Sequence, residues 1–320
     1  PPPTSDNLDD AMVDDEEDDF EDDGNFDDPA STANGRLSQL PEPQPAFAPS
    51  STPLDMTRRI MCWNHIGAIT LLQGDDLNTV DISFTDSAYK RPISFTDNMH
   101  FIVGSLGEDG GIFASDLQHE DDDDMAPVEG LDDMNMSERT KQAVKRSHKK
   151  GGKPTGSSIY FYRFETFGKF LDKDWYLTLP DGERVLGTAS GGGWAAVVTS
   201  RNFLRFFSSG GNQGQVTWLK GYPVTMAGRG RFMAVFYHLG SPLSNGSQKL
   251  GYTLWDAANF QVLSHGSVSC LSKGASLTWV GFSNDCSLMA MDSDGMMSML
   301  VQAGSDGHWE WVPVLDTIGL

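Results

Sequence analysis

The feature that most constrains the fold of this sequence is a unit of four short apolar segments that recurs three times in the C-terminal half. The segments are rich in Val, Phe, Trp, Tyr or Thr and are separated by turns that often contain glycine, which is typical of β-strands. The units start about 38 and 54 residues apart, a loose period close to that of propeller blades. The segments are 185–190, 194–200, 203–209 and 215–220, then those that start at Pro223, Phe232, Leu250 and Phe260, and then those at Leu277, Ser287, Met296 and His308.

The region before these units repeats the pattern less completely. Residues 79–85 and 100–106 are interpreted as the first two strands of another unit, whose remaining strands, 158–164 and 175–180, follow a charged insert. Two strands of a still earlier unit are expected at 58–64 and 67–73. No segment of the folded part keeps a helical period of 3.6 residues. We therefore predict an all-β protein, a β-propeller of four and a half visible units, in which a half-blade implies an unusual closure or a chain that is cut short.

Charge divides the chain into three parts. Residues 1–28 hold 14 Asp or Glu and no Lys or Arg, and the sequence from there to residue 57 is rich in Ser, Pro and Ala. Residues 1–57 therefore bury too little apolar surface to offset the conformational entropy that they would lose on folding. Residues 116–133 carry nine acids and no base, and residues 138–153 carry one Glu and seven basic residues. We predict a disordered acidic linker over 1–57 and a propeller over 58–320 with a charged loop insert at 116–157.

Composition and missing motifs exclude several functions. No apolar run approaches the roughly 20 residues of a membrane-spanning helix. The first residue is not Met, which indicates a processed chain or a fragment. The three cysteines, Cys62, Cys270 and Cys286, show no paired spacing and favour a reducing compartment. The phosphate-loop, serine-hydrolase, zincin and zinc-ribbon signatures are absent and the seven histidines are scattered, so we expect no catalytic, cofactor-binding or metal-binding residue.

Three short motifs are weak signals of chemistry. Residues 190–193, Ser-Gly-Gly-Gly, precede a strand rather than a helix, so they favour a tight turn beside Trp194 over a phosphate cradle. Residues 292–295, Asp-Ser-Asp-Gly, lack the distal Glu of a calcium loop and favour a hairpin turn. The pair Trp255-Asp256 resembles the dipeptide of WD repeats. One alternative remains open, a propeller hydrolase that uses carboxylates such as Asp292 and Asp294 near a central channel.

The basic half of the insert is the candidate site for a macromolecular partner. Its side chains can contact nucleic-acid phosphates or form a nuclear-import patch, or they can pair with the acidic run beside them. The acidic residues 1–28 can in turn bind histones or other basic partners. The basic residues are Arg139, Lys141, Lys145, Arg146, Lys149, Lys150 and Lys153.

Three stretches of the sequence resemble a known family. Residues 190–211 (SGGGWAAVVTSRNFLRFFSSGG), residues 224–240 with VTMAGRG and VFYHLG, and residues 277–295 with LTWVGFS and DSDG are similar to the middle domain of the SepB, minichromosome-loss and chromosome transmission fidelity replisome adaptors. That family includes the WD-repeat and HMG-box DNA-binding proteins. The similarity runs in order from about Arg58 to the C-terminus.

The resemblance implies a non-enzymatic scaffold in the nucleus. Family members are expected to have a WD40 propeller, an acidic linker, a six-bladed propeller and a helical bundle, of which this chain would hold the linker and an incomplete second propeller. The implied role is a homotrimer that links the replicative helicase, through GINS, to DNA polymerase alpha-primase in replication, repair and sister-chromatid cohesion. Chromatin or DNA is a further implied partner, whereas no membrane and no small-molecule substrate is expected. Trp194 and Trp279 are expected to serve the fold.

Overall fold

The computed structural model describes residues 41–75, 77–86, 88, 90–117, 156–164, 174–304 and 307–319, and these residues form twenty β-strands and no helix. The strands build five antiparallel sheets of four strands each. The first two sheets contain β1 (Arg58–Trp63), β2 (Gly67–Leu72), β3 (Asn78–Phe84), β4 (Ile93–Asp97), β5 (Phe101–Leu106), β6 (Gly110–Ser115), β7 (Ser158–Arg163) and β8 (Trp175–Thr178). The third contains β9 (Val185–Gly191), β10 (Trp194–Thr199), β11 (Phe203–Ser208) and β12 (Gln213–Trp218). The last two contain β13 (Pro223–Arg229), β14 (Phe232–His238), β15 (Leu250–Asp256), β16 (Gln261–Ser267), β17 (Leu277–Phe282), β18 (Leu288–Asp292), β19 (Met296–Ala303) and β20 (His308–Asp316).

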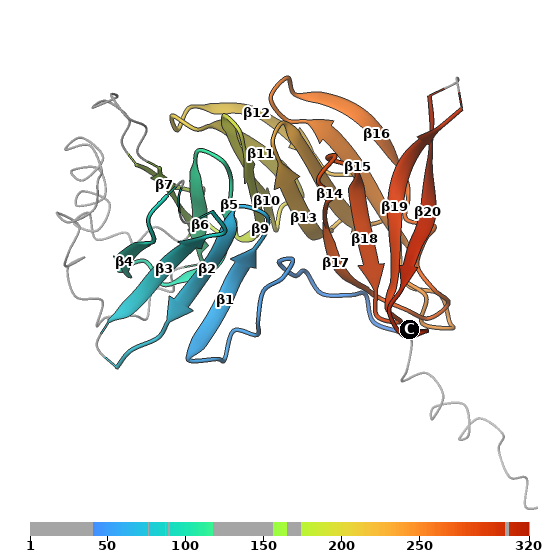
Figure 1. The fold of residues 1–320 in the computed structure, drawn as a ribbon, viewed down its shortest axis with the longest axis horizontal. Helices are drawn as coiled ribbons and strands as arrows, with labels where there is room; N and C mark the ends of the chain where they lie inside the picture. Colours follow the sequence, from blue (N-terminus) through green and yellow to red (C-terminus); the bar gives the residue numbers. More distant parts are fainter. Residues whose placement is uncertain are drawn as a thin grey trace, which may run out of the picture. The chain divides into compact units, whose positions relative to one another are not determined.

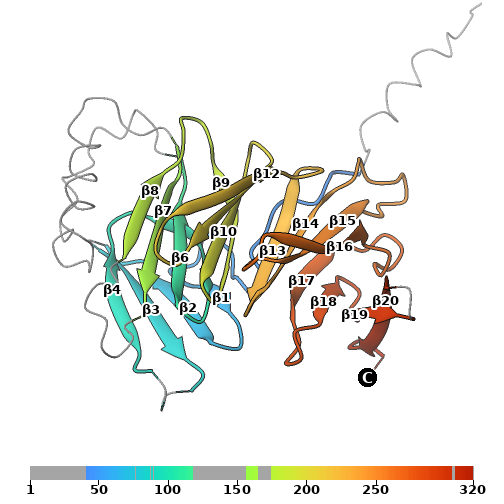
Figure 2. The same cartoon turned by 90° about the horizontal axis from the view of Figure 1, so that it is seen from above.

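Each sheet is a meander in which strands pair in the order of the sequence, and this confirms the predicted β-propeller. The first strands of consecutive sheets, β1, β5, β9, β13 and β17, contact one another in turn, so they are the inner strands of successive blades. Figures 1 and 2 show the blades following one another from β1–β4 to β17–β20 within residues 41–320. No helix of the described residues is long and apolar enough to cross a membrane.

Burial explains why the central strands and the outermost strand of a blade differ in sequence. All six residues of β10 are buried because this strand has neighbours on both sides in its sheet and packs against the adjacent blades. The outermost strand of the same sheet, β12, is almost entirely exposed and is correspondingly polar. Between consecutive blades the apolar faces meet in shared clusters, such as the one that joins Ile112 and Phe161 of the second blade to Val197 and Phe207 of the third. Burial of this kind is the main stabilising contribution to a sheet stack.

The number of blades corrects the sequence prediction. The three C-terminal units are found where they were predicted, but residues 79–85 form the third strand of the first blade rather than the first strand of the second. The prediction missed β4 and β6, so the count of four and a half units was wrong and the described residues hold five complete blades. Strand β6 opens with Gly110-Gly111, a pair that lowers β-propensity. A Cβ atom at Gly110 would lie 2.3 Å from the Tyr162 carbonyl oxygen, so glycine is needed for close approach.

The N-terminal strap, residues 41–57, also corrects the predicted boundary of the linker. These residues lie against the blades: the Phe47 amide donates to the Val224 carbonyl at 2.8 Å and the Thr52 amide to the Ile60 carbonyl at 2.9 Å. Gln44 forms two side-chain hydrogen bonds with the backbone of Leu277, at 2.5 and 2.9 Å. The interpretation of residues 41–57 as part of a disordered linker was therefore wrong. In Figure 1 this strap crosses from the β17–β20 sheet to β1.

The predicted turns are mostly found. Four glycines that follow Asp or Asn in the sequence have the positive φ of tight turns: 71° at Gly182, 87° at Gly246, 77° at Gly295 and 73° at Gly307. Gly193, in the β9–β10 turn, has φ of 84°, which confirms the turn interpretation of residues 190–193. The charged insert lies in the β6–β7 connection of one blade, and its residues 118–155 lie outside the described residues.

Candidate functional site

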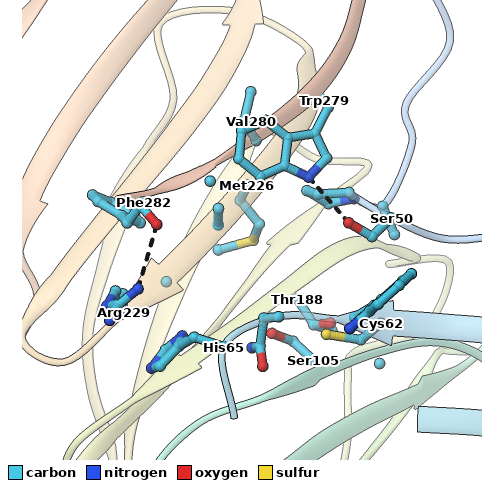
Figure 3. Close-up of a pocket in the computed structure, with 18 residues that line it drawn as sticks. Ser50, Cys62, His65, Ser105, Thr188, Met226, Arg229, Trp279, Val280 and Phe282 are labelled. Atoms are coloured by element: carbon cyan, nitrogen blue, oxygen red, sulfur yellow. Dashed lines mark hydrogen bonds between the residues drawn. The ribbon is translucent and has the colours of Figure 1, made fainter. Parts of the chain in front are cut away.

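The inner strands surround a central cavity, which is the candidate site. All five strands contribute to its wall, and the strap adds Ala48, Pro49 and Ser50. In Figure 3, Trp279 and Ser50 lie on one side and Arg229 and Phe282 on the other. The Trp279 indole nitrogen donates to the Ser50 hydroxyl at 3.0 Å, so the last blade is tied to the strap at the cavity wall. Trp279 is therefore a half-buried cavity residue, whereas Trp194 is only 2% exposed and serves the fold.

The titratable groups of this cavity are poorly suited to nucleophilic catalysis. Burial raises the pKa of the Cys62 thiol to about 11, so the thiol stays protonated at neutral pH. At the rim, the His65 Nε2 lies 3.6 Å from the Glu108 carboxylate. Burial alone would raise the pKa of Glu108, but hydrogen bonds from His65 and from backbone amides, including that of Gly230, hold it below its usual value. The Glu108 carboxylate is thus held in place by its hydrogen-bond donors.

Two polar groups of the cavity have spare hydrogen-bonding capacity. The Thr188 hydroxyl is buried and has no partner among the described residues. Arg229 donates only long hydrogen bonds, 3.5 Å to the Phe282 carbonyl and 3.4 Å to Asn284, and forms no ion pair within the described part of the chain. A cavity with such groups can bind a polar ligand, but it does not present a nucleophile next to a base.

Of the two carboxylates considered for a hydrolase, Asp292 has a structural role. Asp292 accepts hydrogen bonds from the amides of Ser272, Asp294 and Met296 at 2.9 to 3.0 Å, which fixes the β18–β19 turn and confirms the hairpin interpretation. Burial would raise the pKa of Asp292, but these amide donors hold it below its usual value. Neither Asp292 nor Asp294 lines the central cavity. Among the described residues, no three His, Cys, Asp or Glu side chains form a group that could hold a metal ion.

The Trp255-Asp256 pair has a structural role as well. The Asp256 carboxylate is 2% exposed and pairs with Arg231, and it also accepts a hydrogen bond from Asn259 at 2.9 Å. This pairing fixes the turn after β15.

The predicted basic site lies outside the described residues. Its seven residues are Arg139, Lys141, Lys145, Arg146, Lys149, Lys150 and Lys153. The central cavity had no local motif by which sequence reasoning could have found it, because its wall comes from five separate strands.

This geometry defines a β-propeller module. The family described as "Minichromosome loss protein, Mcl1, middle region" matches residues 45–320. The chain therefore belongs to that family, as its resemblance indicated.

Curated relatives come from animals, plants and fungi. The chain is 28% identical to the human "WD repeat and HMG-box DNA-binding protein 1" over 87% of this chain and 21% of the human protein. It is 28% identical to "Protein ENHANCER OF LHP1 1" of Arabidopsis thaliana, over 86% of this chain and 25% of that protein. With "Minichromosome loss protein 1" of Schizosaccharomyces pombe the identity is 23%, over 83% of this chain and 29% of that protein. The chain thus spans less than a third of these relatives.

Solved structures that resemble the chain have lower sequence identity to it than these relatives. A crystal structure of HIRA(644-1017) is 15% identical with a TM-score of 0.40, over 67% of this chain and 55% of that one. Kluyveromyces lactis Hsv2 is 12% identical with a TM-score of 0.42, over 82% and 74% of the two chains.

Proposed function

We propose that this chain is a non-enzymatic scaffold module of a replication-fork adaptor in the nucleus. The observation that carries the proposal is the family match over residues 45–320, which includes all five blades. The names of the relatives add support, since they include DNA-binding and minichromosome-loss proteins. The described cavities offer hydrogen-bond donors and apolar walls rather than a catalytic pair, which suits binding.

The finer part of the proposal concerns the partners. We propose that the module helps to join the replicative helicase, through GINS, to DNA polymerase alpha-primase, and that it acts in replication, repair and cohesion near chromatin. A stack of sheets with buried central strands such as β10 is a rigid platform, and exposed outermost strands such as β12 offer surface to several partners at once.

The proposed assembly of the module is a homotrimer. Sedimentation equilibrium of residues 1–320, at several protein concentrations, measures this directly. A mass three times that of the 35.0 kDa chain supports the homotrimer, and a monomer at every concentration contradicts it for this chain.

The partners are tested by biolayer interferometry with the immobilised chain. Purified GINS and purified DNA polymerase alpha-primase are applied separately, with an unrelated propeller of similar net charge as the control surface. We expect saturable binding of both that exceeds the control. Binding no stronger than to the control surface would contradict the adaptor proposal, while leaving the fold and family unaffected.

A further inference from the structure

A second cavity lies at the beginnings of β1, β5 and β9, whereas the central cavity is lined by later residues of the same strands. Its volume is about 530 Å³. The strap supplies residues 45–48 and 51–54 to its wall, and the starts of β5 and β9 supply most of the rest. One charged side chain from β1, Arg59, faces this cavity.

Arg59 is an unpaired buried cation. The residue is 5% exposed, and its Nε donates to the Thr52 carbonyl at 3.2 Å. Within the described part of the chain no carboxylate pairs with Arg59, and its two terminal nitrogen atoms have no hydrogen-bond partner. Burial lowers the pKa of Arg59, but an arginine side chain keeps its proton. The terminal nitrogen atoms are not fully buried, so they face the space of the cavity with free donors, and a guanidinium group placed in this way can pair with an anion that enters the cavity.

The second arginine of the cavity wall is already neutralised. Arg184 pairs with Asp116 at 2.5 Å, and both side chains are less than half exposed. Of the two guanidinium groups that line the cavity, only Arg59 lacks a carboxylate partner among the described residues, which leaves a single uncompensated positive charge there. A single carboxylate balances that charge, whereas a phosphate carries nearly two negative charges.

The remaining wall is largely apolar. Ile102, Val103 and Leu186 line it from β5 and β9, and the 58% exposed Leu54 and 45% exposed Tyr222 lie at the side that solvent reaches. Exposed large apolar side chains beside a cavity indicate a surface that another apolar group covers. The ligand should therefore combine one carboxylate with a neighbouring large apolar side chain.

We propose that this cavity binds a short peptide segment of a partner protein in which Asp or Glu stands beside Leu, Ile or Phe. The carboxylate accepts hydrogen bonds from the two terminal nitrogen atoms of Arg59, and the apolar side chain covers Leu54, Tyr222 and Leu186. The planar end of a guanidinium matches the two oxygens of a carboxylate, which favours this pairing. The proposal does not rest on the replication role of the chain.

The test uses an array of fluorescein-labelled seven-residue peptides, each with one Asp or Glu next to Leu, Ile or Phe. A matched array replaces the acid by Asn or Gln, and a third replaces it by phosphoserine. Fluorescence anisotropy with the 320-residue chain is expected to identify acidic peptides that bind about tenfold or more tightly than their amide counterparts, since hydrogen bonds to charged groups are strong. No such difference anywhere in the array overturns the proposal, and tighter binding of the phosphoserine peptides overturns its choice of a carboxylate.

Two variants place the interaction at Arg59. Arg59→Met removes the unpaired buried charge while keeping much of the side-chain volume, so the fold should be at least as stable, and binding of the selected peptide should fall about tenfold or more. Arg201→Met, a change at an exposed arginine that bonds only the Asp181 carbonyl, is the matched control and should leave binding unchanged. Equal binding by the Arg59→Met variant and the original chain, with both folded by circular dichroism, contradicts the proposed site.

Discussion

At the scale of single residues, two ion pairs near the third blade differ in burial and should differ in their contribution to the free energy of unfolding. Arg205 and Glu183 form two hydrogen bonds at 2.7 and 2.8 Å, and their side chains are 11% and 0% exposed. Glu183→Gln leaves the Arg205 charge buried without its counter-ion, and we expect a loss of about 3 kcal/mol in the free energy of unfolding. Urea denaturation measures this loss.

The matched control for this change is Asp116→Asn. This variant breaks the half-exposed pair with Arg184, so the expected loss is below about 1 kcal/mol. If both variants lose the same free energy of unfolding, burial does not determine how much each of these ion pairs contributes to stability.

Trp194 should be one of the residues on which the fold depends most. It is 2% exposed, packs in the cluster between the third and fourth blades, and donates from its indole nitrogen to the Gly230 carbonyl at 2.8 Å. Trp194→Ala removes this packing and one of the two hydrogen bonds that the Gly230 carbonyl accepts, the other coming from the Gly192 amide, so we expect a loss of about 3 kcal/mol or more. Thermal denaturation checks this against Trp218→Ala, a change at a 71% exposed residue that should cost far less. Wild-type stability in the Trp194→Ala protein would disprove the structural role.

Cys62 should be unreactive in the folded protein. Burial raises its pKa to about 11 from the ordinary value of 9.0, so at pH 8 nearly all of it is the protonated thiol, which is not the nucleophilic form. We expect iodoacetamide to label Cys62 slowly at pH 8 in native protein and rapidly after unfolding in urea. Peptide mass spectrometry follows the label at each cysteine, and rapid labelling of native Cys62 would contradict its burial.

At the scale of elements, the strap should hold the last blade in place. Gln44 accepts a hydrogen bond from the Leu277 amide and donates one to its carbonyl, much as a neighbouring strand would. In Gln44→Ala these bonds are lost, so we expect faster hydrogen exchange at the amide of Leu277. Gln213→Ala, on the exposed outer strand β12, is the control. Unchanged exchange in the Gln44→Ala protein would show that the strap does not protect β17.

The elements also show what the sequence could reveal. Strands β9 to β20 follow apolar runs separated by glycine turns, so their places could be predicted. The strap could not be found in this way, because side chains such as Gln44 hold it by hydrogen bonds to backbone atoms rather than through an apolar pattern. Strand β6 was missed because close packing against Tyr162 and Phe161 requires glycine where a strand normally has a side chain.

At the scale of the whole molecule, the class of fold was accessible from the sequence and the candidate cavities were not. A repeat of four strands already specifies a propeller, since each sheet needs neighbours to cover its faces. The burial of Arg59, by contrast, has no signal in the sequence, because arginine is usually exposed and only the meeting of β1, β5, β9 and the strap encloses it. Cavity residues from five strands are likewise brought together only by the order of the blades.

The central claim is that this propeller is a scaffold that holds two partners at once. Analytical ultracentrifugation of the chain mixed with purified GINS and DNA polymerase alpha-primase tests it directly, with each pair of components run as a control. The account predicts a species that contains all three components and that is absent from the mixture of the two partners alone. Failure of the chain to bind either partner, or displacement of one partner by the other, would contradict it.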